Sequence, residues 1–569
     1  MGYVYICLAP SAIVPRSCAR KNCCVSVELH FNDRQTEAAP GASLFDCAEA
    51  LGIKVPTSCR KQGKCKECLV EVTGGHQCLS PKTPEEGHLK DNFRLSCRCR
   101  IAAQSGAVRC HTLRRGEMRI EQRAVHLPGG GQSLPLDPAV TRDGDRILLD
   151  GVEIDCATGP ILGLAMDLGT TTVVLRLLNL ETGRIVAGAS FENPQRFGGS
   201  DVMARIQFDT DDGSQLLQRT LAGYITRAIE DFPVDPKSIY EMTVVGNSTM
   251  RDLFFRLDVY SIGQSPYRSI TELDVAAGRR ATTSLTESAG RLGLPLHQRA
   301  RVYGLPIISG HVGADAAACM LAVDLAHEER IVALMDIGTN TEVILGNRRK
   351  ILAASCPAGP AFEGGKISAG MPALPGAIEK IQIRRDGAMR AQVIGGGPAQ
   401  GICGSGLVDL LSQLLRAGRM NARGRFERGA GPILLDVPSQ EPIHFSESDV
   451  SELAQAKGAT VAGLRIIFHN YGIRFDEVDR FYLAGGFGRH LNAAAAKRIG
   501  LIPDIPAGKI LQVGNAAIEG ACLALLSRSK RAELECLVRG VTHCRLETHP
   551  DFFNYFVQGC QFQPLLSPQ

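Results

Sequence analysis

The sequence lacks any uninterrupted run of about 18 apolar residues, the length that a membrane-spanning helix needs. Its net charge is only +4 over 569 residues, whereas a general nucleic-acid binder carries a strongly basic domain. No secretory signal is recognisable, because no basic residue precedes the apolar stretch 3–14 and Pro10 interrupts it. We therefore expect no membrane and no nucleic acid among the partners, and a disordered or artefactual extension at residues 1–24.

Cysteine is abundant but unevenly distributed. Twelve of the 20 cysteines lie within the first 110 residues, and the others are scattered over the rest of the chain. A disulfide scaffold is normally short and dense in cysteine throughout, so this clustering favours a local metal site. Later cysteines such as Cys319 and Cys522 have apolar or glycine-rich neighbours, which is typical of small buried side chains. The pattern indicates reduced thiols and a cytoplasmic protein.

Four of the early cysteines have the spacing of an iron–sulfur site. Five residues separate Cys59 from Cys65, two separate Cys65 from Cys68, and the fourth ligand is either Cys97 or Cys99. A [2Fe–2S] cluster needs four thiolates, and the plant-type loop has four and then two intervening residues, so this loop is one residue longer. A zinc site, the alternative, more often joins two close pairs of cysteines. The spacing therefore predicts a protein that transfers single electrons.

The segments around the cysteine loop predict a small domain followed by a linker. Residues 25–31 alternate apolar and polar side chains as a half-buried strand does, residues 44–51 form a capped helix, and a second strand follows the loop. We expect this domain to cover residues 25–112. Residues 113–160 are rich in glycine and proline and predict a connector.

From residue 161 the sequence predicts an α/β architecture with two similar halves. Apolar strands alternate there with helical stretches and glycine-rich turns. The octapeptide at 165–172, Ala-Met-Asp-Leu-Gly-Thr-Thr-Thr, recurs as Leu-Met-Asp-Ile-Gly-Thr-Asn-Thr at 334–341. Each copy predicts a strand, an Asp-x-Gly-Thr turn and another strand. We place the halves at residues 161–325 and 326–569 and expect them to face one another.

The repeated turns have the composition of a triphosphate clamp. Backbone amides and hydroxyls in such turns bind phosphate oxygens, and an aspartate at the strand end orders Mg²⁺ through water. The phosphate-binding candidates are Asp167, Gly169, Thr170 and Thr171 in the first turn and Asp336, Gly338, Thr339 and Asn340 in the second. A third glycine turn, which permits a base and ribose to lie against the backbone, contributes Gly485, Gly486 and Gly488.

Residues 25–112 resemble the β-grasp [2Fe–2S] ferredoxins. In that family the fourth cysteine commonly follows a tripeptide like Arg-Leu-Ala, and here Arg-Leu-Ser precedes Cys97. The resemblance therefore favours Cys97 over Cys99 as the fourth ligand. The loop departs from many relatives by being basic, which suits either an acidic partner or a solvated surface; the basic residues are Arg60, Lys61, Lys64 and Lys66.

Residues 161–569 resemble the superfamily of acetate and sugar kinases, Hsp70 and actin. That family has two phosphate loops, an adenosine loop and two connecting helices. Its three loops follow one another in the same order as the three turns of this sequence. The resemblance places Asp315 and Asn515 in the connecting helices and implies that Asp167, Asp315 and Asp336 are catalytic, ordering Mg²⁺ and water. Glu363 is a weaker candidate, and we interpret His311, before the first connecting helix, as structural.

The combination of the two parts resembles the reductive activators of corrinoid proteins. Stretches at 193–206, 245–250, 357–364 and 401–406 also match that group. The resemblance implies a β-grasp domain, a linker and a two-lobed actin-like ATPase fold, an α+β and α/β multidomain class. It implies an enzyme with a [2Fe–2S] cluster, ATP and Mg²⁺ that returns one electron to the Co(II) corrinoid of a methyl-transfer protein, restoring Co(I). The electron would come from a donor protein or flavoenzyme, and a homodimer is compatible with the family.

Two other functions remain open at this point. One is ATP-dependent electron donation to another low-potential enzyme, although such donors usually carry a [4Fe–4S] cluster at a dimer interface and few cysteines. The other is a small-molecule kinase with a redox-sensing ferredoxin domain, although no feature of the sequence marks a sugar or acyl site. The wide spacing of Cys536, Cys544 and Cys560 leads us to expect no second cluster.

Overall fold

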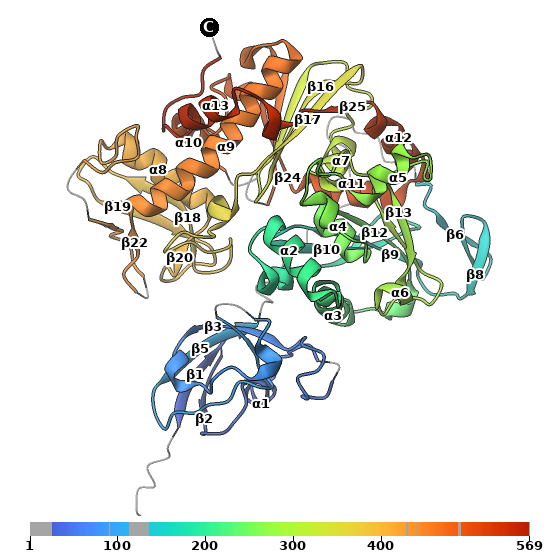
Figure 1. Cartoon of the computed structure of the whole chain (residues 1–569), viewed down its shortest axis with the longest axis horizontal. Helices are drawn as coiled ribbons and strands as arrows, with labels where there is room; N and C mark the ends of the chain where they lie inside the picture. Colours follow the sequence, from blue (N-terminus) through green and yellow to red (C-terminus); the bar gives the residue numbers. More distant parts are fainter. Residues whose placement is uncertain are drawn as a thin grey trace, which may run out of the picture.

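The computed structural model describes residues 26–32, 34–57, 59–89, 92–112, 136–427, 431–439, 441–486 and 491–567. The chain forms a small amino-terminal β-domain and two larger lobes, each built on a six-stranded sheet (Figure 1). The predicted extension at residues 1–24 lies outside the described residues. The predicted multidomain α+β and α/β class, with an actin-like core, is confirmed by this architecture.

The amino-terminal domain is a five-stranded sheet of order β2-β1-β5-β3-β4 with one helix packed on it. Val27, Leu29 and Phe31 of the first strand are fully buried, as the alternating pattern predicts. The Ser43 hydroxyl caps the helix by accepting a hydrogen bond from the Asp46 amide at 3.1 Å. The elements are β1 (Val27–Phe31), β2 (Arg34–Ala38), α1 (Leu44–Ala50), β3 (Leu69–Gly74), β4 (Phe93–Leu95) and β5 (Ala107–Thr112).

The second half of the predicted connector is folded. It forms a three-stranded antiparallel sheet of β6 (Val140–Asp143), β7 (Arg146–Leu149) and β8 (Val152–Cys156), with Asp143 and Arg146 flanking the first turn. The Arg142 side chain joins this sheet to Glu181 of the first lobe at 2.9 Å. This small sheet therefore belongs with the first lobe and is more than a spacer.

The first lobe has the strand order β11-β10-β9-β12-β14-β13. Its strands are β9 (Leu162–Leu168), β10 (Thr172–Asn179), β11 (Ile185–Glu192), β12 (Ile239–Gly246), β13 (Leu285–Ser288) and β14 (Arg301–Gly304). Its helices are α2 (Val202–Asp212), α3 (Leu216–Glu230), α4 (Ser248–Phe254), α5 (Ile270–Ala276), α6 (Ala289–Leu292) and α7 (Ala314–Ala322).

The second lobe repeats this topology. In each lobe a three-stranded antiparallel meander pairs through its first strand with a parallel strand from later in the chain. The strands, of order β24-β23-β15-β16-β17-β25, are β15 (Val332–Asp336), β16 (Thr341–Asn347), β17 (Lys350–Cys356), β23 (Arg480–Ala484), β24 (Ile510–Gly514) and β25 (Val541–His543). Its outer part adds β18 (Ala377–Ile383), β19 (Met389–Val393), β20 (Gly401–Ile402), β21 (Ile433–Leu434) and β22 (His444–Phe445).

One late helix crosses back to the first lobe. The helices after β20 are α8 (Gly404–Arg416), α9 (Glu447–Tyr471), α10 (Ala493–Ile499), α11 (Ala516–Leu526), α12 (Arg528–Arg539) and α13 (Phe552–Gly559). Helix α11 packs beside α7 and against the sheet of the first lobe, where the Thr243 hydroxyl donates to the Ala521 carbonyl at 2.9 Å. Figure 1 shows α7 and α11 together at the junction of the two sheets. The two connecting helices therefore lie at the junction between the lobes.

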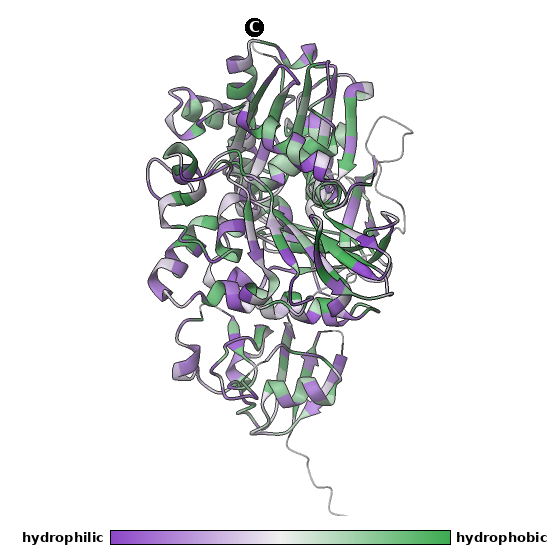
Figure 2. Cartoon of the chain, turned by 90° about the vertical axis from the view of Figure 1, so that its right-hand side faces the viewer, coloured by the Kyte–Doolittle hydropathy of each residue, from purple (hydrophilic) through white to green (hydrophobic). Residues whose placement is uncertain are grey.

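Apolar residues gather along the central strands of the lobes, and the outer helices carry both apolar and polar residues (Figure 2). No helix in the described part of the chain is long and apolar enough to cross a membrane.

Candidate iron–sulfur loop and nucleotide cleft

The pairing of two strands brings the buried cysteines of the predicted cluster together. Strand β3 pairs antiparallel with β4, with Leu69 opposite Leu95, so Cys68 before β3 lies beside Cys97 after β4. The two Sγ atoms are 3.3 Å apart, and both side chains are buried. Cys59 and Cys65, on the loop itself, are half-buried.

The loop between Cys59 and Cys68 turns tightly enough to aim its amides at a sulfur. Its residues with positive φ include Gly63, at +75°, and Lys66, at +61°. Burial raises the pKa of the Cys59 thiol, but the Cys65 amide and thiol and nearby loop amides outweigh it and bring that pKa down to about 7. Amides that stabilise a thiolate are what an anionic iron–sulfur cluster requires. The four thiols and this loop therefore fit a [2Fe–2S] cluster.

The structure separates the two candidates for the fourth ligand. The Cys97 thiol faces the loop, where the Cys68 thiol and the Gly63 amide lower its pKa. The Cys99 thiol is fully buried in the domain core, within electrostatic range of Cys110, and burial raises its pKa to about 12. This placement supports Cys97.

The basic rim of the loop is smaller than the sequence suggests. The Lys61 ammonium is bound by Asp46 at 2.7 Å and Glu49 at 2.6 Å, both on α1, and is thereby occupied within the domain. Arg60 and Lys64 are exposed. Lys66 is half-buried, so Arg60 and Lys64 are the most exposed part of the rim.

The ferredoxin domain rests on helix α3 of the first lobe. The Tyr224 hydroxyl donates to the Leu69 carbonyl at 3.2 Å, and Lys54 pairs with Asp231 at 3.2 Å. Beside these contacts lies a cleft of about 900 Å³, lined by Cys65 on one side and by Arg219 and other α3 residues on the other. The cluster loop thus faces the first lobe across this cleft.

The two Asp-x-Gly-Thr turns meet at the junction of the lobes. The Thr171 hydroxyl of the first turn lies 3.1 Å from the Thr339 hydroxyl of the second. Glu363, at the end of the short 3₁₀ helix η6 (Pro360–Glu363), accepts hydrogen bonds from both threonines, at 2.8 Å from Thr171. Residues far apart in sequence thus converge as the repeat predicts.

The predicted aspartates form a half-buried acidic cluster behind these turns. Asp167 lies in β9 and Asp336 ends β15, and Asp315 lies in the first turn of α7. Burial, with repulsion from neighbouring carboxylates, raises the pKa of Asp167 and of Asp315 to about 7 and that of Asp336 to about 6. Asn515, the cap of α11, donates to Asp167 at 2.7 Å. Clustered carboxylates that solvent reaches only in part are suited to a divalent cation such as Mg²⁺.

Two buried charged residues of this site were missed by the sequence reasoning. Glu342 in β16 is fully buried, and its pKa is raised well above the usual range by burial and by the charges of Asp315 and Asp336. The sequence signal that could have identified it is a glutamate near the start of an otherwise apolar strand. Arg205 of α2 is also fully buried and donates to the Thr170 carbonyl at 2.6 Å; its stretch matched the family without indicating a role.

The first turn is held from behind by three side chains. Besides Arg205, the Asn193 amide donates to the Gly169 carbonyl at 2.8 Å and the Asn247 amide to the Thr170 hydroxyl at 2.9 Å. Thr170 is itself buried, so Thr171 presents the accessible hydroxyl of this turn. The stretches around 193 and 247 therefore fix the shape of the turn.

The predicted adenosine turn lies against the second phosphate turn. Gly485 has φ +103°, and a Cβ there would lie 2.4 Å from the Ile337 carbonyl oxygen and 2.9 Å from the Asp336 carboxylate. Only glycine permits that approach. Gly486 faces open space, and Gly488 lies outside the described residues. Gly338 sits close to Glu363, and the Asn340 side chain is half-buried beside it.

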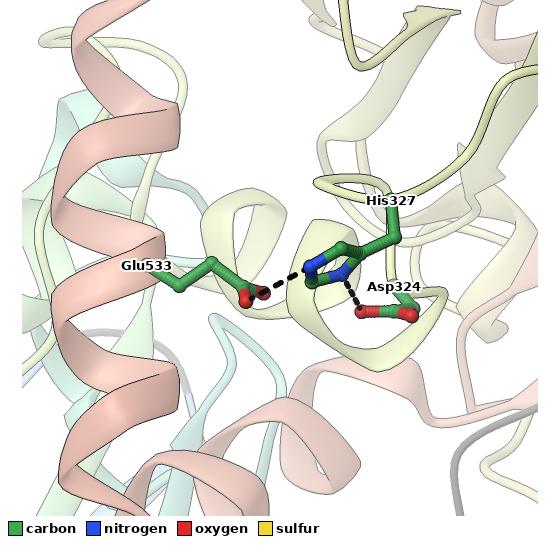
Figure 3. A group of neighbouring side chains, drawn as sticks. All are labelled: Asp324, His327 and Glu533. Atoms are coloured by element: carbon green, nitrogen blue, oxygen red, sulfur yellow. Dashed lines mark hydrogen bonds and ion pairs between the residues drawn. The ribbon is translucent and has the colours of Figure 1, made fainter.

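A second group with metal-like spacing is an ion-pair network. Asp324, His327 and Glu533 lie close together where α12 meets the segment after α7 (Figure 3). The two ring nitrogens of His327 face different carboxylates, Nδ1 at 3.0 Å from Asp324 and Nε2 at 3.7 Å from Glu533. The Lys530 ammonium lies 3.0 Å from both carboxylates and offsets half of their charge. We interpret the group as an ion-pair network that holds α12 against the segment after α7.

Three family models match successive parts of the chain. The 2Fe-2S iron-sulfur cluster binding domain matches residues 28–102, the RACo middle region matches 162–328, and the C-terminal domain of RACo, the ASKHA domain, matches 330–566. The matched segments coincide with the ferredoxin domain and the two lobes.

Full-length relatives are also similar. The chain is 31% identical over 447 residues to "Corrinoid activation enzyme RamQ" of Eubacterium limosum, covering 74% of this chain and 73% of that protein. It is 26% identical over 419 residues to the "[Co(II) methylated amine-specific corrinoid protein] reductase" of Methanosarcina barkeri, covering 69% and 76%. The solved structure of a "Reductive activator for corrinoid,iron-sulfur protein" superposes with a TM-score of 0.70 at 28% identity over 95% of this chain and 98% of that one.

Proposed function

The chain belongs to the RACo family of corrinoid activators, and from this premise we propose how its residues perform the reaction. It is an ATP-dependent iron–sulfur reductive activase that acts on corrinoid proteins. Its cofactors are a [2Fe–2S] cluster in the ferredoxin domain and ATP, with Mg²⁺, in the ASKHA core. The observation that carries the assignment is that one chain holds both a four-cysteine loop and two Thr turns meeting at 3.1 Å.

In the ferredoxin domain, Cys59, Cys65, Cys68 and Cys97 hold the cluster. When bound, it supplies one-electron chemistry that side chains lack. The loop amides stabilise the sulfurs, and burial of Cys68 and Cys97 leaves Cys59 and Cys65 as the side nearest the surface. With a cluster bound, Cys59 and Cys65 would form the edge at which one-electron transfer takes place.

In the nucleotide cleft, the two turns bind the phosphates of ATP. Thr171 and Thr339 donate hydroxyl protons to phosphate oxygens, and Asp167, Asp315 and Asp336 order Mg²⁺ and the attacking water. Gly485 and Gly486, with Gly488, line the adenosine site. Because the turns belong to different lobes, ATP bound between them stabilises the closed arrangement, and hydrolysis removes that stabilisation. Closure shifts the reduction toward Co(I) only if the closed state binds one form of the corrinoid partner more tightly.

The partner is a methyl-transfer protein whose corrinoid has oxidised to Co(II). The activase returns one electron, so that Co(II) becomes Co(I), and a donor protein or flavoenzyme supplies the replacement electron. The exposed Arg60 and Lys64 beside the cluster suit an acidic surface on that donor. We expect the protein in a reducing cytoplasm, where cysteines outside the cluster stay as thiols.

The test is an anaerobic reduction assay. The reduced holoprotein is mixed with a Co(II) corrinoid methyl-transfer protein, with and without ATP, and Co(I) is followed by absorption. We expect Co(I) only when ATP is present, and no Co(I) with Cys65→Ser. The matched control, Cys156→Ser, changes an exposed cysteine outside the loop and should behave as wild type. Failure of the wild-type protein to give ATP-dependent Co(I) with any corrinoid partner would refute the proposal.

A further inference from the structure

We propose that the Glu363 carboxylate occupies the place of the terminal phosphate of ATP in the closed cleft, so that ATP must displace it whereas ADP need not. The inference rests on the proposed function, because it assumes that ATP lies between the two turns. It assigns Glu363 a role in distinguishing the two nucleotides and in resetting the cleft after phosphate leaves.

The geometry of one carboxylate oxygen carries the argument. Glu363 Oε2 accepts hydrogen bonds from Thr171, at 2.8 Å, and from Thr339, and these hydroxyls come from different lobes. A hydroxyl has a single proton to donate, so both threonines are fully used by this oxygen. A phosphate oxygen bound by both turns would need the same two protons and the same position. Glu363 and the terminal phosphate therefore exclude each other.

The charge around Glu363 suits an exchange of one anion for another. Arg205 is fully buried and donates to the carbonyls of Gly199 and Thr170 and to the Met250 sulfur. Among the residues that the structure describes, it donates to no carboxylate. The positive charge of Arg205 is within electrostatic range of Glu363, whose pKa burial nevertheless raises. Arg205 can therefore balance either the carboxylate or a phosphate, and the exchange leaves no buried cation unpaired.

The position of Glu363 explains how it can return to this place. It ends the short helix η6, and Gly364 with φ +87° follows it directly. The Gly359 amide of the same segment donates to the Thr339 carbonyl at 2.7 Å. The segment thus stays attached to the second turn while the carboxylate at its end exchanges with phosphate. Once phosphate has left, the carboxylate binds the two threonines again in its place.

The consequence is a measurable change in nucleotide preference. Glu363→Gln keeps the size of the side chain but removes the charge that strengthens its two hydrogen bonds. The side chain at position 363 then competes less strongly with the terminal phosphate of a non-hydrolysable ATP analogue. ADP lacks that phosphate, so its binding should not change. We expect the ratio of analogue affinity to ADP affinity to rise about tenfold, the loss expected for one charge-assisted hydrogen bond.

The test is calorimetric titration of the cluster-loaded full chain with Mg²⁺ and each nucleotide. Glu379→Gln is the matched control, since Glu379 is a half-buried carboxylate on β18 bonded to Gln392, and its affinity ratio should equal that of the wild type. Unchanged ADP binding by Glu363→Gln shows that the variant is folded. An unchanged or lower ratio, or loss of ADP binding as well, overturns the inference. If the wild type binds neither nucleotide, the proposed function fails first.

Discussion

The packing of the two connecting helices predicts a strong effect of adding one methyl group. Gly520 of α11 faces Ala318 of α7, and a Cβ there would lie 2.0 Å from the Ala318 carbonyl oxygen and 2.5 Å from its carbonyl carbon. Ordinary contacts begin at 3.4 Å. In Gly520→Ala the helices must therefore separate by roughly 1.4 Å at this point, because backbone atoms cannot swing aside as a side chain does.

The expected cost follows from that displacement. Overpacking of this kind destabilises a core by about 1–3 kcal/mol. Each kcal/mol lowers the Tm of a lobe of this size by about 2–4 °C, which gives a fall of roughly 2–12 °C. The activity should fall further than the stability, because α7 carries Asp315 and α11 begins at Asn515, which binds Asp167. A separation of the helices shifts those groups relative to each other.

Thermal melting of the full chain and its ATPase rate measure the two effects. Gly290→Ala is the control, because Gly290 in α6 has an ordinary φ and nothing within 4 Å of the added Cβ. It should melt at or slightly above the wild-type temperature and keep the full rate. If Gly520→Ala also keeps the wild-type Tm and rate, the close approach of the helices does not matter and the reasoning is wrong.

Three further predictions concern single side chains. Cys97→Ser should abolish the visible absorption of the cluster and Cys99→Ser should retain it; the reverse result would exchange the ligand assignment. Asn515→Ala, which removes the hydrogen bond to Asp167, should lower the ATPase rate about tenfold or more while the cluster spectrum stays intact, and an unchanged rate would contradict the proposed site. Lys457 is buried with its pKa lowered to about 7, so the unfolded chain binds more protons between about pH 7 and 10, and the stability of the wild type should rise with pH over that range. Lys457→Met should lose this rise in chemical denaturation, and an equal slope in both proteins would contradict the burial argument.

Much of the nucleotide site could be predicted from sequence because it depends on local patterns. The Asp-x-Gly-Thr turns are short and occur twice, so each copy supports the interpretation of the other. Helix α3 can be predicted from its amphipathic apolar periodicity, whereas α11 is apolar on nearly every side and is indicated by its continuous apolar run. The cysteine loop was equally legible, because ligand spacing within one loop is fixed by cluster geometry.

The parts that sequence could not give depend on tertiary placement. Cys97 and Cys99 are two residues apart, and only the register of β3 against β4 decides which thiol meets Cys68. Helix α11 lies within the second half of the sequence but packs against the first lobe. A division of the chain into two consecutive halves could not predict this. Arg205 looks like any surface arginine of an amphipathic helix, and its burial behind the first turn follows from contacts with distant loops.

The placement of the ferredoxin domain connects the two chemistries of the chain. Its Phe93 ring lies 5.8 Å from the Arg196 guanidinium, and its His88 ring meets Phe197 edge-to-face at 6.0 Å. Arg196 and Phe197 belong to the short helix η3 (Pro194–Gly198), whose cap is Asn193.

Asn193 connects η3 to the phosphate site. Its side-chain amide donates to the Gly169 carbonyl, and its backbone amide donates to the Thr171 carbonyl at 2.7 Å. A shift of the first phosphate turn on binding ATP would therefore reach η3, which the ferredoxin domain contacts, through Asn193. The contacts of Asn193 join the turn that ATP contacts, at one end, to the surface that the ferredoxin domain contacts, at the other. If ATP alters docking, docking must alter ATP affinity by the same factor, because binding free energies are linked reciprocally. On this view ATP acts on electron transfer by deciding where the ferredoxin domain sits, as well as by closing the lobes.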